Sequence, residues 1–248
     1  MTTITTTSFD RFNDTWLDQL RHLVAQLKSA PSPPRTPDHQ HILRALVLKV
    51  TDHFADYYRA KSAVSTADVL TIFSAPWSTS LERSLHWVAG WRPTTLFHLL
   101  ITESSSLFES RILDILRGIK TGDLGDLSPC QFGRVSELQC ETVREENGIS
   151  DELGEWQEGM GDLIEFACGG GCCGRGGLVA LMKLEEGARM ERLAKVIEKA
   201  DELRMKTLRS VVELLTPQQA VEFLIAAAEL QFGIRGWGMN QDARRGHA

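Results

Sequence analysis

Residues 77–100 read WSTSLERSLHWVAGWRPTTLFHLL, and this stretch decides how the chain is interpreted. Its pattern predicts a helix, a sharp turn at Ala-Gly-Trp-Arg-Pro and a second helix directly after the turn. Gly90 is expected to supply the reversal, and Pro93 fits the first turn of the second helix, where its missing N–H costs no hydrogen bond. Three of the six tryptophans of the chain lie here: Trp77, Trp87 and Trp91. The segment therefore predicts an aromatic corner between two helices.

Helical periodicity continues on both sides of this corner. Apolar side chains recur every three or four residues between Phe9 and Leu27, and again from Ile42 to Lys61. Further helices are predicted at residues 106–117, from residue 128 to about residue 167, at 178–215 and at 217–232. No alternation with a period of two is long enough to predict a strand. We therefore predict an all-α fold, a multi-helix bundle of about eight to ten helices with long antiparallel helices in its second half.

Breaks and caps organise these helices into one predicted domain over residues 8–237. A proline-rich loop is expected at 29–37, a glycine- and cysteine-rich loop at 168–177 and a flexible tail at 238–248. Ser128-Pro129-Cys130-Gln131 and Thr216-Pro217-Gln218-Gln219 each predict a capping box with proline at the first helical position. A short helix through Phe73 is expected to begin with Ser65 as its N-cap and Asp68 at its third position.

Composition and charge disfavour several function classes. The 248 residues are 42% hydrophobic, and the formal net charge of −6 argues against electrostatic attraction to nucleic acid or to anionic membranes. No run of roughly 18 apolar residues predicts a transmembrane helix. The first ten residues, MTTITTTSFD, lack the basic and apolar regions of a secretory signal. The five cysteines do not form a disulfide framework, which indicates a reducing, intracellular environment.

No pattern in the sequence predicts a catalytic site, so we expect no enzymatic activity. CGGGCCGRGG at residues 168–177 lacks the glycine, lysine and serine order of a phosphate-binding loop. Its cysteines, Cys168, Cys172 and Cys173, are possible ligands of a soft metal, since thiolates bind zinc. With no histidine nearby, an interhelical loop is the favoured interpretation and no metal is predicted.

Charged residues and histidines are interpreted as structural. His86 and His98 flank the corner at helical positions, where a packed histidine is more common than a ligand or a base. Basic side chains between residues 189 and 209 alternate with acids at spacings of three and four, which predicts a salt-bridged surface and no DNA-binding stripe. The glutamates within residues 141–146 are expected to form a solvated face.

Three ordered blocks of this sequence resemble the plant Delay-of-Germination (DOG) domain, which also forms the C-terminal half of the TGA class of basic-leucine-zipper transcription factors. The blocks are PWSTSLERSLHWVAGWRP at 76–93, GDLGDLSPCQFGRVSELQCETVREE at 122–146 and EKADELRMKTLRSVVELLTPQQAVEFLIAAAEL at 198–230. With the helix around Trp16 and the Tyr57-Tyr58-x-x-Lys61 segment, the resemblance covers most of the chain. It implies an all-helical fold and a regulatory role in plants.

The resemblance also assigns a role to the first block, whose motif residues are expected to brace the corner or to dock a partner. These residues are Trp77, Glu82, Arg83, Trp87, Gly90, Arg92 and Pro93. Ala89 stands where relatives often carry a glycine. Alone, the block is typical of a core corner; followed by the two capping boxes in order, it is typical of the family.

Partners and ligands are implied by the resemblance alone. Family members act through protein–protein contacts and several self-associate, which implies a homodimer or a complex with TGA-type bZIP factors. Residues 1–8 hold no basic region or zipper, so direct binding to nucleic acid is not expected. Some members of the TGA class carry an acyl chain in the helical domain, and the resemblance therefore implies a fatty acid as a ligand of this chain. Haem is attributed to histidines near the C-terminus of the founding dormancy protein, and beyond Phe97 this chain has only His98 and His247, which argues against haem.

Three functions are compatible with these patterns to different degrees. The favoured one is a non-catalytic regulatory protein that docks helical partners in transcription-linked or developmental control, in seed dormancy or in pollen aperture formation. The alternative is a lipid- or small-molecule-sensing helical module, and an enzyme is the least favoured. The expected location is the nucleus, the cytoplasm or both, with peripheral association with the plasma membrane for a protein of the pollen-aperture type.

Overall fold

The computed structural model describes residues 6–34, 36–65, 67–117, 119–169 and 175–246, apart from the side chains of residues 6–8, 115–116 and 159–186. Within these residues the chain forms nine α-helices, one 3-10 helix and no strand, which confirms the predicted all-α fold. The elements are α1 (Thr6–Lys28), α2 (Pro37–Ser65), α3 (Val69–Ser74), α4 (Ser80–Ser84), α5 (Thr95–Ser110), α6 (Ile112–Leu116), the 3-10 helix η1 (Leu124–Asp126), α7 (Pro129–Gly169), α8 (Arg175–Leu214) and α9 (Pro217–Gly246).

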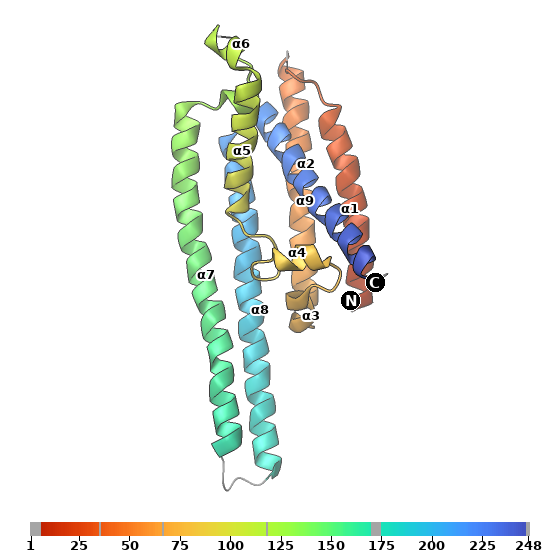
Figure 1. Ribbon diagram of the computed structural model, residues 1–248, viewed down its shortest axis with the longest axis vertical. Coiled ribbons are helices and arrows are strands. Elements are labelled where there is room, and N and C mark those ends of the chain that lie inside the picture. The colour runs from red at the N-terminus through yellow and green to blue at the C-terminus, as the bar shows by residue number, and fades with distance from the viewer. Residues whose placement is uncertain (1–5, 35, 66, 118, 170–174, 247–248) are drawn as a thin grey trace.

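The helices are arranged as a bundle with one long hairpin (Figure 1). α1, α2 and α9 pack against one another, and α5 packs against α9. α7 and α8 pair as antiparallel helices, and their joined end extends well past the other helices (Figure 1). The predicted long antiparallel helices in the second half of the chain are therefore confirmed.

Two clusters of buried apolar side chains meet inside this bundle. The first joins α1, α2, α5 and α9 to the part of α8 from Met205 onward. The second joins α8 as far as Leu203 to Val64 of α2, to α3 and to the corner. Both α2 and α8 thus pass from one apolar cluster into the other. Lys61 and Arg204, which are fully buried, lie on these helices where the two clusters meet.

α1 and α2 are joined by a reciprocal contact between two rings. The Trp16 indole N–H donates to the His53 carbonyl at 2.8 Å, and His53 Nε2 lies 3.0 Å from the Trp16 carbonyl. The rings stack with centroids 4.9 Å apart and an interplanar angle of 2°. Burial lowers the pKa of His53, so the imidazole is neutral and Nε2 donates to the carbonyl.

Both predicted capping boxes are present. Ser128 N donates to Gln131 Oε1 at 2.9 Å, and Gln131 N donates to Ser128 Oγ at 3.3 Å. Thr216 and Gln219 repeat this exchange at 3.0 and 3.3 Å. Gln131 Nε2 also donates to Gln219 Oε1 at 2.8 Å, so the first turns of α7 and α9 are joined through their capping residues.

Two other helix starts differ from the sequence interpretation. α3 is capped by Asp68, which accepts from Thr71 N at 3.0 Å, whereas Ser65 belongs to α2 and is not the N-cap. α4 carries a capping box that the sequence patterns do not predict. Thr79 Oγ1 accepts from Glu82 N at 3.2 Å, and the Glu82 carboxylate accepts from Thr79 N at 2.7 Å.

The corner differs from the predicted pair of longer helices. α4 has five residues, and residues 85–94 form an irregular loop instead of a helix. α5 already begins at Thr95 and ends at Ser110, so the helix predicted at 106–117 is divided between α5 and α6. Ile42, which fits the apolar stripe of α2, is 44% exposed.

The predicted glycine- and cysteine-rich loop is shorter than its sequence suggests. α7 continues to Gly169 and α8 begins at Arg175, so helices cover both ends of the 168–177 segment. Cys172 and Cys173 lie outside the described residues.

The tail predicted to be flexible at 238–248 is instead helical as far as Gly246, and that prediction is wrong. Gly238 is buried, and Asp242 accepts hydrogen bonds from the backbone N–H of Ser80 at 2.9 Å and from its hydroxyl. Polar contacts to α4 thus hold this part of α9. The spacing of apolar residues in the sequence, on which the helix predictions rest, gives no information about such polar contacts.

Gly238→Ala tests this docking. A Cβ at residue 238 would lie 2.7 Å from Thr79 Cβ, so α9 must shift away from α4, and we expect a loss of about 1–3 kcal/mol in the free energy of unfolding. Gly236→Ala is the matched control, because it lies in the same helix with nothing within 4 Å of the added atom. It should stabilise the protein by about 0.5–1 kcal/mol. Urea denaturation measures both, and equal effects would contradict the docked helix.

Candidate functional site

The loop of residues 85–94, called here the corner, reverses the chain between α4 and α5. Val88 and Ala89 carry the positive φ angles, 45° and 59°, and Gly90 does not. The Trp87 N–H donates to the Gly90 carbonyl at 2.6 Å and closes the reversal. The prediction that Gly90 supplies the turn is therefore wrong. Ala89 occupies the left-handed region, where a glycine would cost less than a residue with a side chain.

Gly90 is required for a different reason: the backbone at this position lies too close to Arg204 for a side chain to fit. A Cβ at this position would lie 2.9 Å from Cζ of Arg204 on α8. The backbone of the corner therefore lies directly against a guanidinium group, with no room for a side chain between them.

Arg204 is the centre of the corner. Its side chain is fully buried and its guanidinium donates to three corner carbonyls: Trp87, Val88 at 2.9 Å and Trp91 at 2.7 Å. It also donates to Asp201 on the same helix at 2.5 Å. An irregular loop leaves carbonyls without helical partners, and a buried guanidinium needs acceptors, so each satisfies the other.

Lys61 of α2 completes this buried charge cluster. Its ammonium donates to the Ala89 carbonyl at 2.8 Å and to Asp201 Oδ1 at 2.9 Å. Two buried cations, Lys61 and Arg204, thus contact the same carboxylate oxygen. Burial, which outweighs the attraction of Asp201, lowers the pKa of Lys61 to about 8.

Trp87 donates its indole N–H to the hydroxyl of Ser150 on α7 at 2.9 Å, and its ring centroid lies 5.4 Å from the Arg204 guanidinium. On the other side, Tyr57, Tyr58 and Lys61 of α2 line the same pocket as Trp77 and Trp91. The Tyr57-Tyr58-x-x-Lys61 segment therefore lies against the corner region.

Glu146 of α7 holds the exit of the corner. It is completely buried and accepts from Arg92 Nε at 2.7 Å, from Thr94 N at 2.7 Å and from the Thr94 hydroxyl at 3.2 Å. Two interpretations of the sequence need correction here. Glu146 is not part of a solvated face, and Arg204 is not part of a surface stripe. Lys206 and its partner Glu145, 2.6 Å apart and both exposed, do form the predicted surface pairing.

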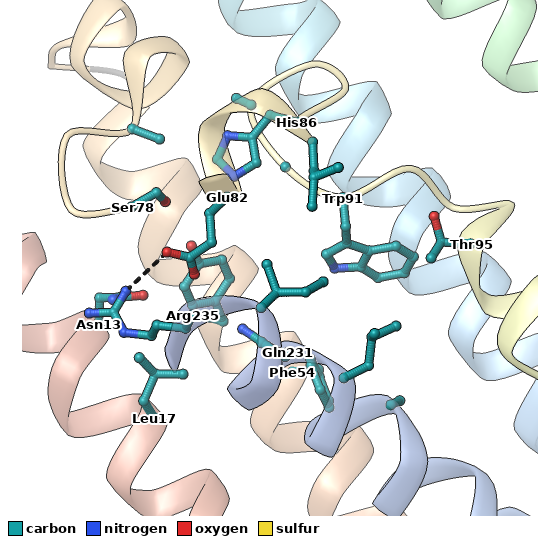
Figure 2. A pocket seen from close by; sticks show the side chains of 18 of the residues that line it. Asn13, Leu17, Phe54, Ser78, Glu82, His86, Trp91, Thr95, Gln231 and Arg235 are labelled. Carbon is teal, nitrogen blue, oxygen red and sulfur yellow. Dashed lines mark ion pairs between the residues drawn. The ribbon is translucent and has the colours of Figure 1, made fainter. Parts of the chain in front are cut away.

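Three of the seven predicted motif residues, Trp87, Gly90 and Arg92, contact Arg204 or Glu146 directly, and the other four lie around this network. Arg83 is exposed and donates to the Ser78 carbonyl at 2.5 Å. Pro93 is buried in the turn that precedes α5. Glu82 caps α4 and lies 3.6 Å from Arg235 of α9 (Figure 2). Three buried residues of the network, Arg204, Asp201 and Glu146, are not identified by the sequence patterns.

A half-open pocket of about 170 Å³ lies beside the corner (Figure 2). α1, α2, α4, α5 and α9 contribute its lining, which is mainly apolar. This volume is below the roughly 300–1,000 Å³ of sites that enclose a drug-sized ligand. The fatty acid implied by the resemblance stays a prediction, and a long acyl chain would not be enclosed here.

A second, more open groove of about 650 Å³ lies between α2 and α8. Within the described part of the chain, no group of three or more His, Cys, Asp or Glu residues is placed to hold a metal ion. His98 is exposed on α5, and His247 lies outside the described residues. Among the helices that are described, none is both long enough and apolar enough to cross a membrane.

Comparison with known proteins identifies the family. A family model described as seed dormancy control matches residues 19–102, which include the whole corner. Protein DOG1-like 4 of Arabidopsis thaliana is 32% identical over 232 residues, covering 93% of this chain and 91% of the relative. The chain belongs to the DOG1-like family.

Other relatives of this DOG1-like protein extend the comparison. Protein RESPONSE TO ABA AND SALT 1 of Arabidopsis thaliana is 30% identical over 242 residues, covering 92% of this chain and 94% of the relative. Transcription factor TGA1 of the same species is 26% identical over 218 residues, covering 86% of this chain but 50% of TGA1. The resemblance seen in the sequence is therefore confirmed for both groups.

Arg92→Ala separates a bracing role from a docking role. It removes a charged partner of the fully buried Glu146 carboxylate, so we expect a loss of more than about 1 kcal/mol in the free energy of unfolding. Lys206→Ala is the matched control, since its partner Glu145 is exposed, and it should cost less than about 0.5 kcal/mol. Guanidinium denaturation measures both; an unchanged stability for Arg92→Ala would identify Arg92 as a docking residue.

The charge cluster predicts unequal effects of removing its acid or its lysine. Asp201→Asn leaves two buried cations without a carboxylate and should cost about 3–5 kcal/mol. Lys61→Met leaves Asp201 and Arg204 as a neutral pair and should cost less than about 2 kcal/mol. Denaturant titrations at pH 7 compare the two variants, and equal losses would contradict the shared carboxylate.

The lowered pKa of Lys61 predicts the pH dependence of stability. Between about pH 8 and 10 an unfolded lysine keeps its proton while the folded Lys61 loses it, so the unfolded state binds more protons. The free energy of unfolding should therefore rise with pH in this window. Burial raises the pKa of Tyr57 and Tyr58, which opposes the rise only above about pH 10, where unfolded tyrosines ionise. Lys61→Met should lose the rise, and thermal denaturation at pH 7.5, 8.5 and 9.5 measures it.

Proposed function

We propose that this DOG1-like protein is a non-catalytic regulator that works by docking protein partners, with a role in seed dormancy. The family model described as seed dormancy control and the DOG1-like relatives support the dormancy role over a role in pollen apertures. The similarity to TGA1 supports transcription-linked control in the nucleus or the cytoplasm, with a TGA-type factor or a second copy of the chain as partner.

The chemistry of the corner supports a structural use of its charged groups. Lys61, Asp201, Arg204 and Glu146 are directed at one another and at corner backbone atoms. A general acid or base needs a group that can reach a substrate proton, and Arg204 and Glu146 are completely buried in contacts that hold the loop.

An exposed apolar surface at the end of α5 supports docking and carries the proposal. Phe108, Ile112, Leu113 and Ile119 are 42%, 42%, 66% and 52% exposed and lie within twelve residues of sequence; we call them the apical surface. α6, which carries two of them, projects from the bundle beyond the end of α5 (Figure 1). Clustered exposed apolar side chains are typical of protein interaction sites.

The double variant Ile112→Asp, Leu113→Asp tests this surface. We expect the wild type to elute as a dimer or to capture TGA factors, and the variant to lose this association by tenfold or more without a change in melting temperature. Leu48→Asp is the matched control, since Leu48 is 63% exposed on α2, and it should leave association intact. Size-exclusion chromatography with light scattering and a pull-down with a TGA factor measure these outcomes. A monomeric wild type that captures no partner would overturn the proposal.

A further inference from the structure

The pocket beside the corner combines apolar walls with a buried cation. Phe54, Trp91, Leu96 and Leu99 are among the apolar residues of its lining, and Lys61 and His86 line it as well. In Figure 2 the His86 ring points into the space bounded by Trp91 and Glu82. None of the residues of the apical surface lines this pocket, so a ligand can bind here whether or not that surface docks a partner.

The surroundings of Lys61 have an excess of buried positive charge. Among the described residues, Lys61 and Arg204 share the carboxylate of Asp201, and the other acceptors of Arg204 are neutral carbonyls. Such an excess is costly in a buried site, and either loss of the Lys61 proton or a bound anion would relieve it.

Lys61 and His86 also have hydrogen-bonding groups that the described residues do not use. An ammonium group has three N–H donors, and among the described residues Lys61 uses two, for Ala89 O and Asp201. The side chain of His86 makes no hydrogen bond to the described residues that line this pocket. Burial and the positive charges of Lys61, Arg204 and Arg83 lower the pKa of His86 to about 4, so the imidazole is neutral and can donate through one nitrogen.

The other charged residues that line the pocket are already paired. Glu82 and Arg235 lie 3.6 Å apart, and Arg235 also contacts Asp14 at 3.0 Å and the Trp77 carbonyl at 3.2 Å. An anion is therefore favoured near Lys61 and not near Glu82 and Arg235, whose charges already compensate one another.

The size of the pocket limits the apolar part of a ligand. An apolar cavity of about 150 Å³ is large enough to hold benzene, so about 170 Å³ accommodates one six-membered ring with a small polar group. We propose that this pocket binds a small monocarboxylate, whose carboxylate lies between Lys61 and His86 and whose apolar body, about one ring in size, packs against Phe54 and Trp91.

Benzoate is the probe, and benzamide and benzylamine have the same ring with a neutral or a cationic group. Calorimetric titration of the full chain should show benzoate binding at least tenfold more tightly than benzamide, with no binding of benzylamine. Benzoate should also raise the melting temperature. Palmitate should bind more weakly than benzoate, because the pocket does not enclose its chain.

Variants locate the binding in this pocket. Ala227→Phe fills it from α9 and should weaken benzoate binding by more than tenfold, while Ala226→Phe, a half-buried neighbour outside the lining, should leave binding unchanged. Lys61→Met should remove the preference for benzoate over benzamide. Circular dichroism checks that each variant is folded, and Lys61→Met provides the decisive comparison if Ala227→Phe does not fold.

Several results would overturn the proposal. Equal binding of benzoate and benzamide, or tighter binding of benzylamine, would exclude a carboxylate site. Tighter binding of palmitate would show a pocket that opens for an acyl chain. Absence of binding by any probe, or an equal loss in Ala226→Phe and Ala227→Phe, would show that this pocket is not a ligand site.

Discussion

The buried guanidinium of Arg204 is the interaction on which the corner depends. A loop without helical hydrogen bonds cannot bury its carbonyls unless they find donors, and a guanidinium cannot leave water unless its N–H groups find acceptors. The corner meets both needs, since the carbonyls of Trp87, Val88 and Trp91 surround one side chain. Neither part is stable alone in a buried position. This mutual requirement explains why Gly90, which has no side chain, must lie against the same group.

The location of this cluster gives it a second effect, on the packing of the whole bundle. Apolar clusters tolerate sliding of one helix along another, because dispersion and the hydrophobic effect have little directional preference. Charged hydrogen bonds do not tolerate it. Lys61 and Arg204 lie where two apolar clusters meet, and Glu146 ties the exit of the corner to α7. The polar network therefore fixes the register of α2, α7 and α8 relative to one loop.

Sequence patterns predict the parts of this fold that follow from local physics. Helical periodicity and the capping boxes at Ser128 and Thr216 depend on neighbouring residues only, and the structure confirms them. The site depends on contacts between distant residues. Arg204 lies four residues from both Ala200 and Leu208, so it falls on the apolar face of α8, and a charge on that face is a usable signal of burial. Adjacent Glu145 and Glu146 carry no local feature that separates an exposed acid from a buried one.

α5 connects the corner to the surface where docking is proposed. Its first turns, at Thr95, Leu96 and Leu99, line the pocket, and its last turn carries Phe108 of the apical surface. The helix has 16 residues and so spans about 24 Å as one rigid element. A group that binds in the pocket contacts α5 and α9 together, and it can alter the apical surface only if it favours one position of α5 over another. Since Glu146 fixes the backbone at Thr94, directly before this helix, any such displacement of α5 must first overcome the hydrogen bonds that hold the corner.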